Sequence, residues 1–275
     1  MKAKQLAFFS ILSVSMFFSC TKEKTTDPAD DSMTQELTAA RLQSDILYDD
    51  VSLEVMQVNV ENGLGTPTTE TLPCATITVS PQDLTTWPKT VTIDYGTSGC
   101  TGSYGFVRKG KITYTLNKKL NEAGAVITVT FDNYSVNNYK LEGVFTLTNN
   151  GPNNGNLNLT TRLVNGKITY PDGRWYSRTS TINWVQTAGA STPLSILDDE
   201  VNITGEATIR SSANNELISS TKTALLRKFS CANIVSGQLN LNYNGITGVL
   251  DFGSGSCDKN AVLNIGTKNY DVTLP

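Results

Sequence analysis

The sequence predicts an all-β protein, a large antiparallel meander that forms a curved sheet or a sandwich, with one N-terminal helix. After Leu72, runs that alternate apolar residues with Thr, Asn and Ser are typical of strands with one buried and one solvated face. Turns rich in Asn, Gly and Pro separate about fourteen such runs. Two kinds of segment also occur twice, which indicates that the sheet is built from internal repeats.

The first repeat is a pair of segments bounded by cysteines. Cys74 and Cys100 lie 26 positions apart, and so do Cys231 and Cys257. Each segment holds two alternating runs around a turn, which predicts a β-hairpin that brings its two cysteines together. We therefore expect the disulfides Cys74–Cys100 and Cys231–Cys257, one of three possible pairings. Four free buried thiols are the alternative, and zinc is disfavoured because no CxxC spacing occurs.

An aspartate recurs at the same place in both cysteine-bounded segments. Asp94 and Asp251 each stand two positions before a glycine, Gly96 and Gly253. A repeated carboxylate invites a functional interpretation. The simpler expectation is that each one accepts a hydrogen bond from the backbone of the following turn.

The second repeat lies inside the frame made by the cysteines. The pentapeptide GKITY occurs at 110–114 and again at 166–170, and LEGVFTL at 141–147 loosely matches ITGEATI at 203–209. Because the repeats interleave along the chain, we interpret residues 34–275 as a helix followed by one large repeat-built β domain, with two fused halves as the alternative.

The first residues predict an export signal, residues 1–19. Lys2 and Lys4 precede an apolar run that is too short for a membrane-spanning helix and ends in Ser19 and Cys20. The ending FFSC resembles the lipobox of bacterial lipoproteins, with Phe in the place where Leu is usual. The resemblance implies cleavage before Cys20 and attachment of lipid to that residue, which anchors a protein to a membrane without crossing it. An ordinary signal that happens to contain a cysteine is the alternative.

A tether and a helix follow the signal. Residues 20–33 are expected to form the tether, because they are dominated by small, polar and charged residues. Residues 34–60 predict a helix whose apolar stripe packs on the sheet, while Arg41, Asp45 and Asp50 face elsewhere. Gly63 indicates the end of this helix, because glycine readily adopts the left-handed conformation found there. The predicted stripe consists of Leu42, Ile46, Leu53, Met56 and Val60.

Composition excludes several classes of function. Without Lys2 and Lys4 the chain has 20 basic and 25 acidic residues and no basic run, which argues against nucleic acid as a partner. The chain has no histidine, so Ser–His and Cys–His nucleophiles and His-ligated metals are excluded. No phosphate loop or dinucleotide fingerprint occurs. We expect no enzymatic activity, no catalytic residues, no metal site and no cofactor.

Composition does not exclude catalysis by a pair of carboxylates, and the sequence contains one candidate pair. If residues 127–131 and 141–147 bury their apolar side chains on one face, Asp132 and Glu142 lie opposite each other on the exposed face. Cross-strand neighbours are about 5 Å apart at Cβ, close to the carboxyl separation of a retaining glycosidase. The simpler interpretation is that Lys140, Lys167 or water reduces the repulsion between two surface carboxylates. A bulge that shifts the register, so that the two acids are not opposite each other, is a further possibility.

A turn with flanking aromatic residues is the candidate binding site. In YPDGRWY, residues 170–176, alternation places Trp175 with Ser177 and Thr179 on a polar face, next to Arg174. An exposed Trp beside a cation can stack on a sugar ring or on a partner's side chain. The alternative is that Trp175 covers its cross-strand neighbours. Arg174 and Trp175 are therefore the predicted ligand-binding residues.

These features together resemble a known group of proteins. The lipobox, the helix after the tether and the segments IDYGTSGC, RKGKITYT and FDNYSVNNYKLEG are similar to the all-β lipoproteins of Bacteroidota. The resemblance covers most of the mature chain, carries no catalytic motif and implies an outer-membrane location, on the periplasmic face or the cell surface.

Three functions remain to be weighed. We expect a non-catalytic, lipid-anchored envelope protein that binds a glycan, a protein or another envelope component. A carrier that holds a lipid or other apolar ligand in the curved sheet is the alternative. A glycan hydrolase that uses carboxylates is less favoured.

Overall fold

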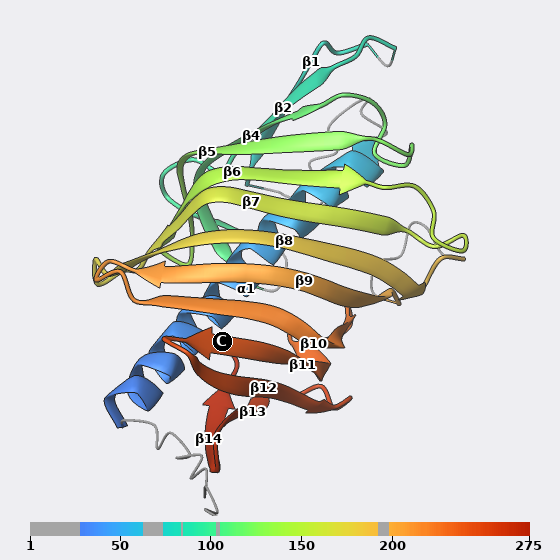
Figure 1. The fold of residues 1–275 in the computed structure, drawn as a ribbon. Helices are drawn as coiled ribbons and strands as arrows, with labels where there is room; N and C mark the ends of the chain where they lie inside the picture. The colour runs from blue at the N-terminus through green and yellow to red at the C-terminus, as the bar shows by residue number, and fades with distance from the viewer. Residues whose placement is uncertain (1–27, 63–73, 84, 103–104, 192–197) are drawn as a thin grey trace, which may run out of the picture.

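The computed structural model describes residues 28–62, 74–83, 85–102, 105–191 and 198–275. The predicted signal peptide, Cys20 and the first part of the predicted tether lie outside these residues. One helix and one antiparallel sheet make up the fold (Figure 1). Their bounds are α1 Pro28–Asn62, β1 Thr76–Ser80, β2 Lys89–Asp94, β3 Cys100–Thr101, β4 Val107–Leu116, β5 Val126–Val136, β6 Tyr139–Asn149, β7 Asn158–Thr169, β8 Trp175–Ala188, β9 Glu200–Ser211, β10 Glu216–Lys228, β11 Ile234–Tyr243, β12 Ile246–Ser254, β13 Asn260–Ile265 and β14 Lys268–Thr273.

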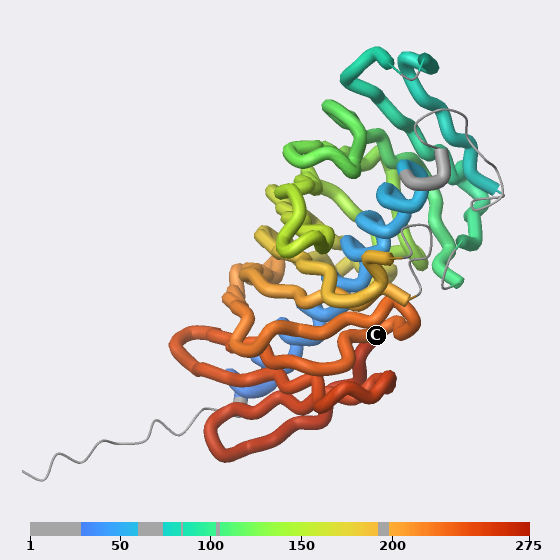
Figure 2. The backbone as a smooth tube through the Cα atoms, turned by 90° about the vertical axis from the view of Figure 1, so that its right-hand side faces the viewer, coloured from blue at the N-terminus to red at the C-terminus, as the bar shows by residue number. Residues whose placement is uncertain are grey.

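Within the described residues the sheet is a 14-stranded open meander, in which strands that follow each other along the chain lie side by side. Of these strands only β3 leaves this path, and it pairs with β4. Short turns join the antiparallel strands, which is why neighbours in sequence become neighbours in the sheet. The predicted all-β meander with one N-terminal helix is confirmed, and it forms one curved sheet with the helix inside the curve (Figures 1 and 2).

Helix α1 is longer than the sequence predicts. It begins at Pro28, so residues 28–33, which we assigned to the tether, are helical. The first turn contains Asp30 and Asp31, whose negative charges favour a helix N-terminus. Asp31 also receives hydrogen bonds from Lys268 at 2.5 Å and from Tyr270 at 2.8 Å, which fix this turn to β14. The predicted stop at Gly63 lies outside the described residues.

The concave face of the sheet surrounds α1, so the helix is buried on more than its apolar side. The prediction that Arg41 and Asp50 face away from the core is wrong, because they are only 4% and 3% exposed. Asp45 is half-buried and also faces the sheet, where it pairs with Arg178. A stripe that faces one flat surface would leave these residues in water, whereas a curved sheet covers the flanks of the helix as well.

Small side chains allow the helix to approach the middle of the sheet. Helix α1 comes closest to β9 and β10. There Ser180, Ala207 and Ser219 face it in one cross-strand row. Ser219 donates a hydrogen bond to the Ala207 carbonyl at 3.0 Å and accepts one from Arg41 Nε at 3.1 Å. Larger apolar side chains surround this row and form the core between helix and sheet.

The cysteine-bounded segments fold as the sequence predicts. Disulfides join Cys74 to Cys100 and Cys231 to Cys257. The strands that they bracket pair as antiparallel hairpins, β1 with β2 and β11 with β12. Asp94 accepts a hydrogen bond from the Gly96 N–H at 2.9 Å, and Asp251 accepts the equivalent bond from Gly253 at 2.8 Å. The repeated aspartates therefore have the structural role that we expected.

The loose repeat of residues 141–147 and 203–209 has a backbone cause. Gly143 and Gly205 occupy equivalent positions in the two segments, each at an irregularity in strand pairing, with φ of 122° and 146°. A Cβ atom on Gly205 would lie 2.2 Å from the Thr181 carbonyl oxygen. Both positions therefore require glycine, as β-bulges often do. In the part of the chain that the structure describes, no helix is both long and apolar enough to cross a bilayer.

Candidate functional site

Buried ion pairs occupy one end of the concave face. Arg108 on β4 is fully buried and donates from Nε to Asp50 at 2.9 Å, and its Nη2 pairs with Asp50 and, at 2.9 Å, with Glu54. Tyr95 donates to Glu54 at 3.1 Å. Burial lowers the pKa of Arg108, but the charges of Asp50 and Glu54 and the hydrogen bonds to Asp50 outweigh it and raise that pKa. The guanidinium is therefore charged and holds two acids of α1.

A second ionic cluster holds the middle of the helix. Arg178 on β8 pairs with Asp45 at 2.6 Å, and Arg227 on β10 pairs with Asp49 at 2.9 Å. Arg41 of the helix also pairs with Asp45. The sequence alone did not predict these arginines. A signal was present, because Arg178 alternates with Tyr176, on the face opposite to the polar face of Trp175 and Ser177.

Helix α1 therefore fills and closes the concave face of the sheet. Charges and hydrogen bonds connect α1 to Tyr95, which follows β2, and to strands from β4 to β14, and apolar side chains fill the space between these contacts. A buried pair that loses one partner is strongly destabilising, so the helix is firmly held in this arrangement. The large surface that remains for a partner is the outer face of the sheet.

The outer face carries a continuous row of side chains that runs from β1 to β14. We call it the central row. Most of its members have an uncharged hydroxyl or amide group, and the charged exceptions are Arg162 and Glu206. In the order of the strands, the central row consists of Ser80, Thr90, Thr115, Thr128, Thr146, Arg162, Thr181, Glu206, Ser220, Asn240, Val249, Asn264 and Asn269.

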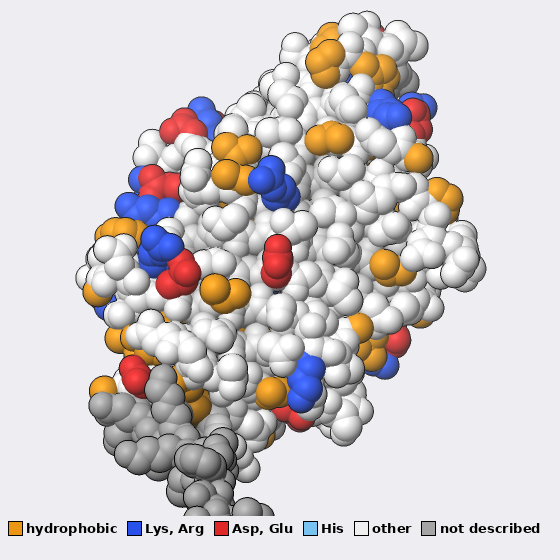
Figure 3. Space-filling view, in the orientation of Figure 1, with side chains coloured by type: hydrophobic (Ala, Val, Ile, Leu, Met, Phe, Trp, Pro, Cys, Tyr) orange, Lys and Arg blue, Asp and Glu red, His pale blue; other side chains and the backbone are white. Residues whose placement is uncertain are grey.

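Threonines extend the central row into a two-dimensional array. Residues 90–92, 113–115 and 128–130 all have the pattern Thr-X-Thr, and the register aligns their threonines across β2, β4 and β5. Neighbouring strands are about 4.8 Å apart, and alternate residues along a strand are roughly 6.8 Å apart. Each hydroxyl can both donate and accept a hydrogen bond. The array thus offers a regular set of uncharged polar contacts. In Figure 3 most of this face is white, the colour of uncharged polar side chains and of the backbone, with a few charged and apolar side chains among them.

Charged side chains of opposite sign pair at the borders of the outer face. Lys111 pairs with Asp94 at 2.9 Å, and Lys228 pairs with Glu200 at 2.8 Å at another border of the sheet. Arg210 and Glu216 form a further exposed pair. Figure 3 shows blue and red side chains next to each other along the side near the ends of β6 to β9. Because these charges compensate one another, they leave little net field for a charged ligand.

The carboxylate pair considered for glycan hydrolysis does not form. Strands β5 and β6 pair at Thr130–Val144 and again at Ser135–Lys140, so β5 has one extra residue between these points. The bulge moves Asp132 out of register, and it lies opposite Lys111 on β4.

Glu142 instead has lysine neighbours. It lies 3.3 Å from Lys140 Nζ and 3.9 Å from Lys167 Nζ. The structure therefore supports the simpler interpretation, in which lysines and a bulge account for both acids. Among the described residues, no group of three or more His, Cys, Asp or Glu side chains could hold a metal ion.

The two predicted ligand-binding residues point to different neighbours. Arg174 donates from Nε to Asp172 at 2.8 Å and lies over the Tyr170 ring, 5.5 Å from its centroid. Trp175 is 36% exposed, and Lys167 Nζ lies 5.0 Å from its ring centroid. The expected Arg174–Trp175 pair is replaced by a Lys167–Trp175 contact. Trp175 nevertheless lies at the border of the outer face, as alternation predicted.

Comparison with known proteins gives no assignment, since no family model, curated protein or solved structure matches this chain at a significant level.

Proposed function

We propose that this protein is a non-catalytic binding module of the outer membrane, anchored through lipid on Cys20, whose outer sheet face binds an uncharged envelope glycan. The observation that carries this proposal is the array of aligned hydroxyl and amide groups that crosses the sheet. A neutral polysaccharide presents hydroxyl groups at regular intervals and needs no opposite charge from its partner.

The chemistry of the outer face favours a glycan over a protein. The central parts of protein–protein interfaces are enriched in aromatic, Met and Arg side chains. Here the exposed large apolar residues Val144 and Ile218 stand among threonines, serines and asparagines. Trp175 adds an exposed ring at the border, where a sugar can stack on the side that Lys167 does not cover.

The carrier alternative requires α1 to leave the concave face. A pocket for a drug-sized ligand typically has roughly 300–1,000 Å³, whereas the cavity beside α1 offers about 50 Å³ to the centre of a water molecule. Releasing the helix would separate Arg108 from Asp50 and Glu54, whose side chains are 2% exposed. This cost disfavours a cycle in which the helix moves out to admit a lipid.

The anchor is tested by replacing Cys20. The variant Cys20→Ser lacks the sulfur that accepts lipid, so we expect the protein to appear in the soluble fraction, without the mass of the acyl chains. Membrane fractionation and intact-mass spectrometry measure both effects. Unchanged membrane association together with an unchanged mass would show that Cys20 is not the anchor.

The glycan face is tested by adding charge to the central row. The double variant Thr90→Glu/Thr128→Glu places carboxylates where a neutral chain would lie, at positions whose cross-strand neighbours are the uncharged Ser80, Thr115 and Thr146. We expect its affinity for the preferred neutral polysaccharide to fall roughly tenfold or more, equal to about 1.4 kcal/mol. Affinity electrophoresis against a panel of soluble glucans, mannans and galactans provides the measurement.

Two further variants complete this experiment. Asn121→Glu/Ala123→Glu adds the same two charges in the exposed β4–β5 turn and should leave binding unchanged. Trp175→Ala should weaken binding if the ring stacks on sugar. If the panel shows no binding, or if the double variant binds as well as the wild type, the glycan proposal fails. Retention of an envelope protein instead, lost in the double variant, would assign the face to a protein partner.

A further inference from the structure

One row of hydroxyl groups on the outer face has no hydrogen-bond partner among the described residues. It is the first part of the central row, Ser80, Thr90, Thr115 and Thr128, which lie on the neighbouring strands β1, β2, β4 and β5. Ser80, Thr90 and Thr115 are exposed, and Thr128 is half-buried. We call these four residues the free row. Each of its hydroxyl groups is able to donate one hydrogen bond to a ligand and to accept others.

The threonines of the row beside it form hydrogen bonds within the sheet. Thr92 Oγ1 and Thr113 Oγ1 lie 3.3 Å apart, within hydrogen-bond distance, and Thr130 donates to the Thr113 carbonyl at 3.2 Å. We call these three residues the paired row. They lie on β2, β4 and β5, each two positions along its strand from a member of the free row. The free hydroxyl groups therefore form a line across the strands rather than along them.

The direction of this line determines the repeat of a polymer that follows it. Neighbouring strands are about 4.8 Å apart, whereas alternate residues along one strand are roughly 6.8 Å apart. The sheet curves around α1, so its outer face is convex and the side chains on it diverge (Figure 2). The hydroxyl groups of the free row are therefore slightly farther apart than the strands that carry them. One sugar of an extended β-1,4-linked chain is also slightly longer than the strand spacing, so successive sugars meet successive strands.

Other glycosidic linkages do not keep this register. Chains with β-1,3 or α-1,4 linkages coil, which makes their advance per sugar shorter than that of an extended β-1,4-linked chain. A chain with α-1,6 linkages is flexible, so it loses more conformational entropy when it is straightened along a row of contacts. The free row thus favours the linkage that is already straight before binding.

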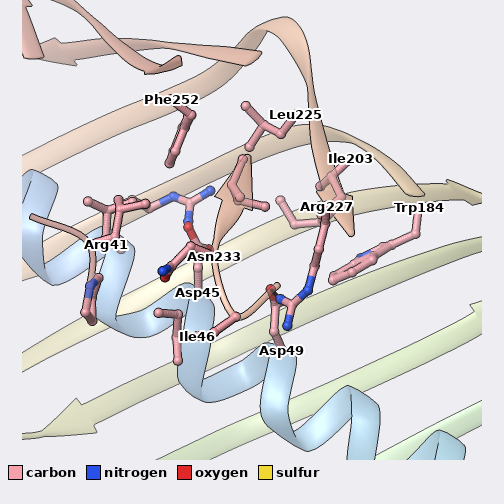
Figure 4. A pocket seen from close by; sticks show the side chains of 16 residues that line it. Arg41, Asp45, Ile46, Asp49, Trp184, Ile203, Leu225, Arg227, Asn233 and Phe252 are labelled. Atoms are coloured by element: carbon pink, nitrogen blue, oxygen red, sulfur yellow. Dashed lines mark hydrogen bonds and ion pairs between the residues drawn. The ribbon is translucent and has the colours of Figure 1, made fainter. Parts of the chain in front are cut away.

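The cavity on the concave side is not suited to a sugar chain. It lies between α1 and the sheet and offers about 50 Å³ to the centre of a water molecule (Figure 4). Its wall includes the charged side chains of Arg41, Asp49 and Arg227. A polymer therefore has to bind on the outer face, where the free row is accessible along its length.

We propose that the free row binds a neutral β-1,4-linked polysaccharide in its extended form, with one sugar on each of β1, β2, β4 and β5. Successive sugars of such a chain are turned over and present different oxygen atoms, which suits Ser and Thr hydroxyl groups because they both donate and accept. Each contact on an exposed surface is weak, so the affinity comes from several sugars that bind at once. This inference rests on the proposed glycan function and adds the linkage of the glycan and its direction across the sheet.

The linkage is tested with uncharged polysaccharides that differ in how their sugars are joined. Affinity electrophoresis of the lipid-free mature protein compares glucomannan and galactomannan, whose backbones are β-1,4-linked, with laminarin, pullulan and dextran, which have β-1,3, mixed α-1,4 and α-1,6, and α-1,6 linkages. We expect at least one β-1,4-linked chain to bind roughly tenfold or more tightly than the other three. Equal or tighter binding of a chain with another linkage overturns this inference and leaves the proposed function standing. If no polysaccharide binds, the proposed function fails and this inference fails with it.

Two matched double variants locate the chain on the free row. Thr90→Val/Thr115→Val removes two free hydroxyl groups, whereas Thr92→Val/Thr113→Val removes two hydroxyl groups of the paired row from the same strands. Valine is close to threonine in shape and favours strands, so both variants should keep the sheet, as circular dichroism can verify. We expect the first variant to lose roughly fivefold or more in affinity for the β-1,4-linked chain and the second to change it less than about twofold. Wild-type affinity in the first variant, or an equal loss in both, would contradict the proposed path of the chain.

Discussion

Replacing Arg108 by methionine is expected to lower the free energy of unfolding by roughly 3–5 kcal/mol, the usual cost of leaving buried charges without their partner. Arg108 is fully buried, and it contacts Asp50 and Glu54, whose side chains are 2% exposed. Methionine fills much of the space of the arginine stem but provides no positive charge. Urea denaturation followed by circular dichroism measures the loss as a lower midpoint.

The interpretation of that loss depends on two comparisons. Arg174→Met removes an exposed arginine that pairs with Asp172, and we expect a change below about 1 kcal/mol. The triple variant Arg108→Met/Asp50→Leu/Glu54→Leu removes the stranded acids as well and should recover most of the stability, because apolar replacements of buried ion pairs are often neutral. A triple variant as unstable as Arg108→Met would show that packing of the arginine, rather than its charge, is decisive.

Removing one disulfide should have an effect of similar size. The double variant Cys231→Ser/Cys257→Ser opens a loop with a sequence separation of 26 residues. In the chain-entropy model this costs roughly 3–4 kcal/mol, because the unfolded chain gains freedom. The β11–β12 hairpin should therefore become the weakest part of the sheet.

Hydrogen exchange and urea denaturation measure this effect together. Amide protection should fall most in β11 to β14, on the side of the sheet that the open loop belongs to. The equivalent variant Cys74→Ser/Cys100→Ser serves as the comparison, and its loss of protection should instead be centred on β1 and β2. Equal loss of protection across the whole sheet in both variants would contradict a local role for the disulfides.

Local patterns in the sequence predict much of this fold. Alternation with a period of two assigns residues such as Tyr176 and Trp184 to the buried face, and the register confirms it. The two cysteine frames predict their hairpins because both strands and the turn lie within one short segment. The turn role of Asp94 and Asp251 is equally local, since each bonds a backbone N–H two residues away.

The features that the sequence did not predict depend on contacts between residues that are far apart in the chain. The bulge near Asn133, with φ of 47°, removes Asp132 from its expected place opposite Glu142. Helical periodicity assigns Asp50 to a solvated side, because the pattern contains no information on the curved sheet that brings Arg108 to that side. The central row is visible only after the register aligns residues from different strands, since each threonine alone is ordinary for a strand.

The contacts of α1 have a consequence for the order in which the chain folds. Each strand pairs with its neighbours in sequence, whereas Arg41 bonds Ser219 and Asp31 bonds Lys268, which are 178 and 237 positions away. The helix is synthesised before any of these partners exist, so it must wait for the C-terminal strands before it can dock. During that interval we expect its acidic side chains to keep the helix soluble, although the apolar residues that it will bury have no partner yet. We therefore expect the same carboxylates that fasten the helix in the finished protein to protect the nascent chain from aggregation.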